Sequence, residues 1–298
     1  MPAWLLWTVL AVVCWGIWAV LSKVIGDSLS GQQSQALSTI GLLPVMAGLA
    51  FAKSAWVGGE RRRRGIVVAV ICGVISALGN VAYYQALASG AKAATVVPLT
   101  ALYPIVTVAL AAVFLGEKLN RIQAAGVLAS LMAIYLFNIP DEKGFLSGAL
   151  AYAILPMVLW GVAGLLQKIT TNDVSGELSA LCFLAAFVAL AFVLFWREPV
   201  NFGSVTGRTW MLVIALGFFL AIGNVAILLA FASGGKASII APMGGLYPLV
   251  SVPIAIGLLG ERVGRREVCG IALALLSVVA LSIESKAEVM LKEEEILR

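Results

Sequence analysis

The chain has 298 residues, of which 61% are hydrophobic and 12% are charged, and its formal net charge is +5. A soluble domain carries about 25% charged residues, and a soluble fold of this length cannot bury so much apolar surface, so the composition indicates a protein that lies in lipid. The absence of histidine excludes histidine metal sites, histidine-based triads and histidine proton relays.

Ten apolar runs follow one another along the chain, separated by short polar or glycine-rich breaks. Each run is close to the ~20 residues that a helix needs to cross the hydrocarbon core, and helices satisfy their own backbone hydrogen bonds in lipid. The sequence therefore predicts an all-α integral membrane protein with ten transmembrane helices and a charged cytoplasmic tail over 286–298. The predicted spans are roughly 3–24, 34–53, 65–88, 93–115, 121–139, 145–169, 178–197, 209–232, 237–259 and 266–284.

The lysine and arginine residues in alternate loops predict the orientation of the chain. With the amino terminus in the cytoplasm, 12 of the 20 lysine and arginine residues fall inside and 8 fall outside. The run Arg61–Arg64 is the main anchor, and its alternative role would be lipid or nucleic-acid binding. We expect both termini to be cytoplasmic, the membrane to be a bacterial inner membrane, and no nucleic acid to be a partner.

A long internal repeat runs through the sequence. About half of the positions from 77 to 117 are identical to those from 221 to 261, always at an offset of 144. An earlier match at an offset of 145 joins "WGIWAVLSK" (15–23) to "WGVAGLLQK" (160–168). The chain is therefore a duplication of a five-helix unit, which we place at 1–139 and 140–285. The matched phrases are "ALGNVA" and "AIGNVA", "ASGAKAATVVP" and "ASGGKASIIAP", "LYP" twice, and "LGEKL" and "LGERV".

The number of helices in each copy has a consequence for topology. Because five is odd, a second copy must enter the membrane from the opposite face. The two copies are then inverted repeats, which is how many secondary transporters build a central site and two alternating states.

The ordered motifs resemble the EamA domain of the drug/metabolite transporter superfamily. The resemblance rests on the "WG…K" first helix, the "GN" third helix, "SG-x-KA…P…LYP" and "LGE", and it covers nearly the whole chain twice. It implies a ten-helix metabolite carrier of the kind that includes amino-acid exporters, without naming a substrate.

Aromatic and amide side chains inside the spans predict a substrate cavity near the midplane. Tyr83, Tyr84 and Gln85 lack polar counterparts in the second copy, and such asymmetry is expected where an asymmetric substrate binds. The alternatives are anchoring of aromatic residues at the membrane interface and hydrogen bonds between helices. Gln35, Ser38 and Thr39 are expected at the outer half of the same cavity. The predicted substrate-binding residues are Trp15, Trp18, Asn80, Tyr83, Tyr84, Gln85, Tyr103, Trp160, Asn224 and Tyr247.

Prolines and charges repeat at matching places in the two copies. A proline inside a helix removes a backbone donor and bends the helix, so the four prolines predict hinges, with plain packing tolerance as the alternative. The six charges predict gates at the two mouths, with snorkelling at helix ends as the alternative. The hinge residues are Pro98, Pro104, Pro242 and Pro248; the mouth charges are Lys23, Lys92 and Glu261 outside, and Lys168, Lys236 and Glu117 inside.

The function predicted from these features is alternating-access transport. No predicted span carries a central carboxylate, which disfavours carboxylate-centred proton antiport, and no GxxxxGK[ST] motif is present for ATP. We expect a secondary transporter, not an enzyme, for an amino acid or a similar zwitterionic or cationic metabolite, with export weakly favoured over uptake. The alternatives are an uptake carrier for a quaternary amine, sugar or phosphorylated metabolite and, more remotely, a membrane-embedded enzyme or a receptor. We expect no cofactor or metal, coupling to protons or another ion as an option, and a monomer or homodimer.

Overall fold

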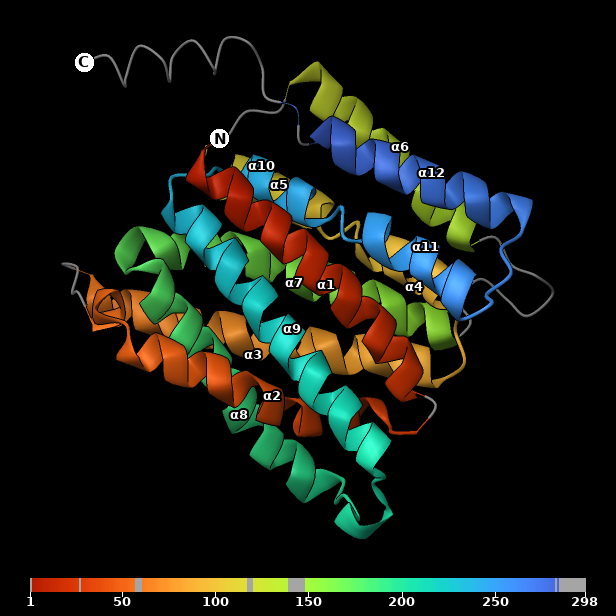
Figure 1. The fold of residues 1–298 in the computed structure, drawn as a ribbon. Helices are drawn as coiled ribbons and strands as arrows, with labels where there is room; N and C mark the ends of the chain where they lie inside the picture. The colour runs from red at the N-terminus through yellow and green to blue at the C-terminus, as the bar shows by residue number, and fades with distance from the viewer. Residues whose placement is uncertain are drawn as a thin grey trace.

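The structure is a computed structural model, which describes residues 2–26, 28–56, 61–116, 120–138, 148–281 and 283. All regular structure in these residues is helical, with no strand (Figure 1). This confirms the prediction of an all-helical chain. The predicted tail over 286–298 lies outside the described residues.

The described residues form twelve α-helices and two short 3-10 helices. They are α1 (Ala3–Gly26), α2 (Gly31–Phe51), η1 (Lys53–Trp56), α3 (Arg62–Ala88), α4 (Ala93–Thr100), α5 (Pro104–Phe114), α6 (Arg121–Asn138), α7 (Gly148–Asp173), α8 (Gly176–Arg197), η2 (Phe202–Ser204), α9 (Gly207–Ala232), α10 (Ala237–Gly244), α11 (Pro248–Leu258) and α12 (Arg265–Leu281).

Eight helical segments in the described part of the chain are long and apolar enough to cross a membrane. The continuous ones are α1, α2, α3, α7 from Ile154 onward, α8 and α9, and the other two are α4 with α5 and α10 with α11. The fifth predicted span corresponds to α6, which is not among the eight. The tenth predicted span corresponds to α12, whose apolar part is the shorter stretch Val268–Ala280.

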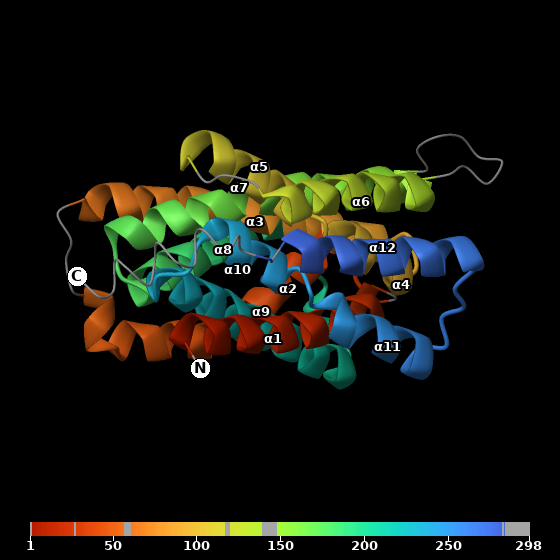
Figure 2. The same cartoon turned by 90° about the horizontal axis from the view of Figure 1, so that it is seen from above.

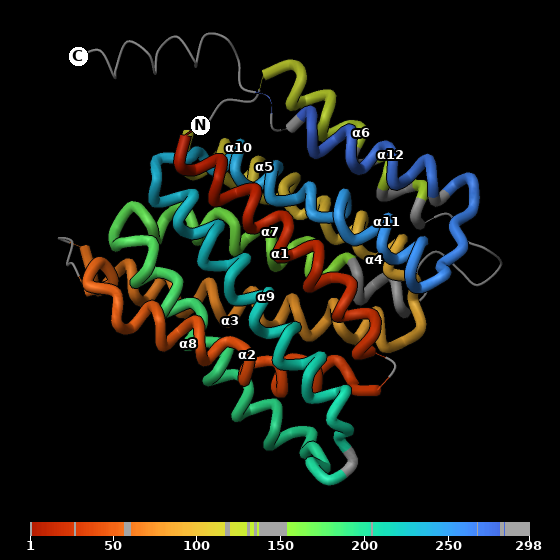
Figure 3. The backbone as a smooth tube through the Cα atoms, viewed as in Figure 1, coloured from red at the N-terminus to blue at the C-terminus, as the bar shows by residue number. Residues whose placement is uncertain are grey.

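The fourth and ninth apolar runs each fold as two helices rather than one. The first half-helix of each run ends at Thr100 or Gly244, and the second begins at Pro104 or Pro248. Proline suits a first helical position, because its missing N–H would have no partner there. Figure 3 shows the course of the backbone through both breaks. The half-helices pack crosswise, with α4 against α11 and α10 against α5.

The helices pack in pairs that join the two halves of the chain. Helix α1 lies along α9, and α3 lies along α7 (Figures 1 and 2). Helices α6 and α12 lie side by side at one edge of the bundle. One cluster of buried residues, which includes Leu37, Phe183 and Phe231, extends through the interior.

Two glycines allow backbones from the two halves to touch. A Cβ at Gly217 of α9 would collide with the Ser38 carbonyl of α2, and a Cβ at Gly73 of α3 would collide with the Phe183 carbonyl of α8. Because a glycine has no side chain to separate the helices, α2 meets α9, and α3 meets α8, at backbone distance. Gly73 and Gly217 are separated by the repeat offset of 144, and Ser38 and Phe183 by the offset of 145, so the same contact is made twice.

The turns between helices also repeat. Ser30 and Ser175 are the N-caps of α2 and α8, and each side chain accepts a hydrogen bond from a backbone N–H of the first turn. Gly90 and Gly234 follow α3 and α9 with φ of 88° and 89°, a left-handed conformation that glycine adopts without strain at helix ends.

Candidate functional site

A small cavity of about 60 Å³ lies inside the bundle, and both halves of the chain contribute to its wall. Its residues come from α1, α3, α7, α8 and α9 and from the breaks of the two divided spans. The lining residues are Trp15, Trp18, Ser76, Asn80, Tyr103, Trp160, Ala163, Gln167, Phe187, Leu220, Asn224 and Tyr247.

The structure brings seven of the ten predicted substrate-binding residues to this one cavity. They are Trp15, Trp18, Asn80, Tyr103, Trp160, Asn224 and Tyr247. Their placement on the wall is observed, and their contact with a substrate stays a prediction.

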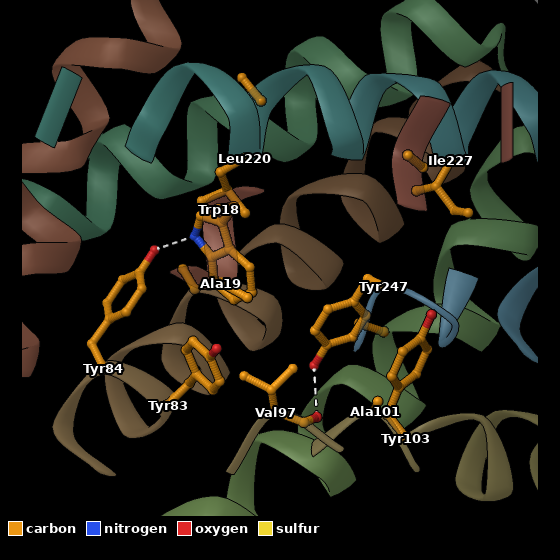
Figure 4. Packing of buried hydrophobic residues seen from close by; sticks show 14 of the residues in the cluster. Trp18, Ala19, Tyr83, Tyr84, Val97, Ala101, Tyr103, Leu220, Ile227 and Tyr247 are labelled. Carbon is orange, nitrogen blue, oxygen red and sulfur yellow. Dashed lines mark hydrogen bonds between the residues drawn. The ribbon is translucent and has the colours of Figure 1, made fainter. Parts of the chain in front are cut away.

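The other three predicted residues lie behind the wall. Tyr83 is fully buried, and its ring stacks on Trp18 with centroids 4.8 Å apart. The hydroxyl of Tyr84 accepts a hydrogen bond of 2.8 Å from Nε1 of Trp18 (Figure 4). Oε1 of Gln85 accepts one of 3.2 Å from the backbone N–H of Gly31, at the start of α2. In this conformation, therefore, Tyr83 and Tyr84 support the tryptophan wall, and Gln85 joins α3 to α2.

The side chains expected from α2 also lie away from the cavity. Ser38 and Thr39 donate to carbonyls of their own helix, those of Gln35 and Ala36. Gln35 is buried, and neither its Oε1 nor its Nε2 has a hydrogen-bond partner in the described structure.

Five lining residues were not predicted from the sequence. Ser76 lies one helical turn before Asn80, and Gln167 interrupts an apolar run, so both carried a polar signal that could have found them. Ala163, Phe187 and Leu220 carried none, because an apolar residue in a membrane helix reads the same whether it faces lipid, protein or a cavity.

Trp160 is held edge-on against α3. Its Nε1 donates to Oδ1 of Asn80 at 3.1 Å and to the Ser76 carbonyl at 3.3 Å. The approach requires Gly79, where a Cβ would lie 2.6 Å from Nε1 of Trp160.

The second tryptophan of this arrangement, Trp15, packs on α9 in the equivalent way. A Cβ at Gly223 would lie 2.5 Å from its Cδ1. The neighbouring asparagine differs from its counterpart, because Nδ2 of Asn224 donates to the Leu220 carbonyl at 2.9 Å. The scaffold of the two copies matches, but the hydrogen bonds on it do not.

Tyrosines at the two helix breaks reach across to the opposite copy. The hydroxyl of Tyr103 donates to the Ala241 carbonyl of α10 at 3.0 Å. The hydroxyl of Tyr247 lies 2.9 Å from Oγ1 of Thr100 and donates to the Val97 carbonyl of α4 at 3.3 Å (Figure 4). Val97 and Ala241 are separated by the repeat offset of 144, so the two contacts are equivalent.

One of the predicted mouth charges caps a half-helix. The carboxylate of Glu261 accepts hydrogen bonds from the backbone N–H groups of Ala93 (2.8 Å) and Ala94 (2.7 Å), at the start of α4. Two free N–H groups and the positive end of the helix dipole make this a favourable place for a carboxylate. The "LGE" motif of the second copy thus closes onto the half-helix of the first copy.

The other mouth charges lie at or near helix ends. Nζ of Lys23 donates to the Ala91 carbonyl at 3.0 Å, Lys92 and Lys236 are the N-cap residues of α4 and α10, and Lys168 lies near the end of α7. Glu117 falls outside the described residues. An ion pair of 3.4 Å between Arg64 and Asp173 joins the start of α3 to the end of α7.

Solved structures and curated proteins are similar to this chain. A crystal structure of a protein matches 92% of this chain and 94% of its own with a TM-score of 0.65 at 22% identity, which is a likeness of fold. The uncharacterized transporter YojE of Bacillus subtilis is 31% identical over 157 residues, which are 52% of this chain and 49% of YojE. The uncharacterized protein MJ1333.1 of Methanocaldococcus jannaschii is 37% identical over 76 residues, which are 26% of this chain and 55% of that protein. The matches span about half the length of these curated relatives.

A family model matches the chain twice and covers most of it. The model describes the EamA-like transporter family, and its two matches are residues 2–139 and 147–283. The apolar helices agree with this assignment. The chain therefore belongs to the EamA-like transporter family and is an integral membrane protein.

Proposed function

We propose that the protein is a secondary transporter that moves a small organic metabolite by alternating access between two inverted repeats. The observation that carries the proposal is the cavity, whose wall takes equivalent tyrosines, Tyr103 and Tyr247, from the breaks of both divided spans. Discontinuous helices that meet at a central site are a recurrent device of secondary transporters.

The repeats supply the two states that such a cycle needs. The first repeat is residues 1–139 and the second 140–285, each with five spans, when α6 and α12 are counted as spans and each divided helix as one. The matched contacts at Val97 and Ala241, and at Ser38 and Phe183, support a two-fold relation between the repeats. With both termini on the cytoplasmic side of a bacterial inner membrane, the helices of the second repeat cross the membrane in the opposite directions to those of the first.

In this proposal, the structure holds a cavity that is too small for the substrate. Ligand pockets usually enclose about 300–1,000 Å³, and the cavity is far smaller, so binding requires the wall to move outward. Pro98, Pro104, Pro242 and Pro248 flank the breaks at which the half-helices would tilt. Glu261 on the start of α4, beside Lys92, would close the outer mouth, and the opening of that mouth would break this contact.

The substrate class favoured by the sequence is an amino acid or a similar zwitterionic or cationic metabolite, with export weakly preferred; of these, the uncharged wall of the cavity favours a compound of zero net charge. Coupling to protons or another ion is a further part of the proposal. The test begins with purified full-length protein, screened for thermal stabilisation by amino acids, sugars, nucleosides and quaternary amines. Compounds that stabilise it are then measured for counterflow in liposomes, with and without a pH gradient.

We expect a labelled stabilising compound to accumulate in liposomes that were preloaded with the same compound unlabelled. Accumulation against a preloaded pool requires a carrier, and protein-free liposomes are the control. Stabilisation without counterflow would instead assign the protein to the receptor alternative. A Trp160→Ala variant, which removes one wall of the cavity, should lose both stabilisation and counterflow.

A further inference from the structure

Asn80 carries a buried hydrogen-bond donor that no described residue accepts. Its side chain is 3% exposed and lines the cavity, and its Nδ2 has no partner. The orientation of the amide follows from its neighbour, because the Trp160 indole can only donate and therefore requires the Asn80 oxygen. The amide nitrogen is left without an acceptor, at a cost in free energy that a bound acceptor would remove.

A second donor without a partner among the described residues belongs to another helix of the cavity wall. Nε1 of Trp15 makes no hydrogen bond to any residue that the structure describes, although Trp15 lines the cavity. Its counterpart, Trp160, donates twice. In the second copy, the carbonyl of Leu220, which is equivalent to that of Ser76, accepts a hydrogen bond from the Asn224 amide nitrogen within α9 instead.

The cavity wall carries no formal charge among the described residues. It contains no Lys, Arg, Asp or Glu. A charged group in a membrane interior needs a counter-charge or polar partners to offset the loss of water. The groups in the wall that could attract a cation are the faces of the aromatic rings, and one face of Trp18 is already covered by Tyr83.

These observations together indicate the shape and charge of a ligand that would fit the cavity. We propose that the cavity binds a planar compound of zero net charge, which presents a hydrogen-bond acceptor to Nδ2 of Asn80 and Nε1 of Trp15. The flat walls of Trp15, Trp18 and Trp160 fit a planar group, and the two donors fix its acceptor edge. The role of this compound as the transported substrate rests on the proposed function, whereas its binding does not.

The charge rule can be tested with matched probes on one ring. Nicotinamide is neutral, nicotinate is an anion and 1-methylnicotinamide is a cation, and a second series is indole-3-acetamide, indole-3-acetate and tryptamine. Binding to full-length protein in detergent is measured by titration calorimetry. We expect the neutral amide of at least one series to bind about tenfold more tightly than its charged analogues. Equal or tighter binding of the cations or anions, or no binding by either neutral amide at millimolar concentration, would overturn the inference.

Variants test the two donors. Asn80→Asp replaces the donating amide with a carboxylate, and it should weaken the neutral probe about tenfold and strengthen 1-methylnicotinamide or tryptamine. Asn224→Asp, at a position whose amide already donates to Leu220, should cost less. A gain for the cation is a result that mere structural damage would not produce.

Trp15→Phe keeps an aromatic ring and removes the N–H donor together with part of the indole ring system. It should weaken the neutral probe several-fold, while Trp7→Phe, at an outward-facing position of the same helix, should leave its affinity unchanged. Unchanged affinity in Trp15→Phe and in Asn80→Asp would overturn the assignment of the donors.

Transport assays separate this inference from the proposed function. Binding that follows the charge rule without counterflow would contradict the transport proposal and leave the ligand class intact. Counterflow of charged compounds alone would contradict the ligand class and leave the transport proposal intact.

Discussion

At the scale of single residues, the cavity depends on glycines that let tryptophans approach neighbouring helices. Gly79 and Gly223 receive Trp160 and Trp15 at equivalent places in the two copies. The absence of a Cβ is what positions each indole, so these glycines shape the wall without lining it.

Gly79→Ala should destabilise the protein by about 1–3 kcal/mol, because overpacking forces a large side chain off its site. The new Cβ would lie 2.6 Å from Nε1 of Trp160 and would break its bond to Asn80. The measurement is the unfolding transition in mixed micelles at increasing SDS. The control is Gly257→Ala, where a Cβ meets nothing within 4 Å; an equal loss in both variants would contradict the packing argument.

Tyrosine hydroxyls in the same region differ in whether they are bonded. Tyr247→Phe removes contacts to Thr100 and the Val97 carbonyl, so we expect a loss of about 0.5–1.5 kcal/mol in the free energy of unfolding. Tyr83→Phe removes a buried hydroxyl that has no partner in the described structure and should be neutral or stabilising. The same unfolding assay compares them, and a greater loss at Tyr83 than at Tyr247 would refute this account.

At the scale of elements, the divided spans are the least continuous parts of the bundle, and hydrogen bonds join each of them to the other copy. Each half-helix is short, at 8 or 11 residues, and short helices depend on caps and tertiary contacts. Glu261 on the start of α4 is one such contact, and the tyrosines at the breaks are others.

Glu261→Gln keeps one oxygen acceptor but removes the charge from the N-terminus of α4. We expect a loss of about 0.5–2 kcal/mol, the range for helix caps and helix–charge interactions, together with faster hydrogen exchange at residues 93–97. Glu198→Gln is the matched control, since the Glu198 side chain makes no hydrogen bond within the described residues. Exchange that is unchanged at α4 would show that the carboxylate does not hold this helix.

The helices also show which parts of the fold and of the site could be predicted from the sequence. The apolar runs located the helices to within a few residues, because length and hydrophobicity dominate in lipid. The division at Tyr103 and Tyr247 was expected only as a bend, because proline spacing alone does not tell a kink from a full break. The i, i+3 and i+4 spacing placed Tyr83 and Tyr84 with Asn80, yet that face of α3 is wide enough to meet both the cavity and the core behind it.

At the scale of the whole molecule, the topology proposal has a direct test. Ser30 and Ser175 are equivalent N-caps, so replacing either one with cysteine removes the same capping hydrogen bond in each copy. In a background without the natural cysteines, Ser30→Cys should react with an impermeant maleimide in intact cells, and Ser175→Cys only after permeabilisation. Labelling of both from the same side would contradict inverted repeats.

The backbone joints at Gly217 and Gly73 constrain any motion of the molecule. The backbones of α2 and α9 are in contact where the Ser38 carbonyl meets Gly217, and those of α3 and α8 are in contact in the same way at Gly73. We therefore expect each pair to move as one body. Spin labels placed on the two members of a pair should keep one sharp distance, with or without ligand, while labels on different pairs report all of the change.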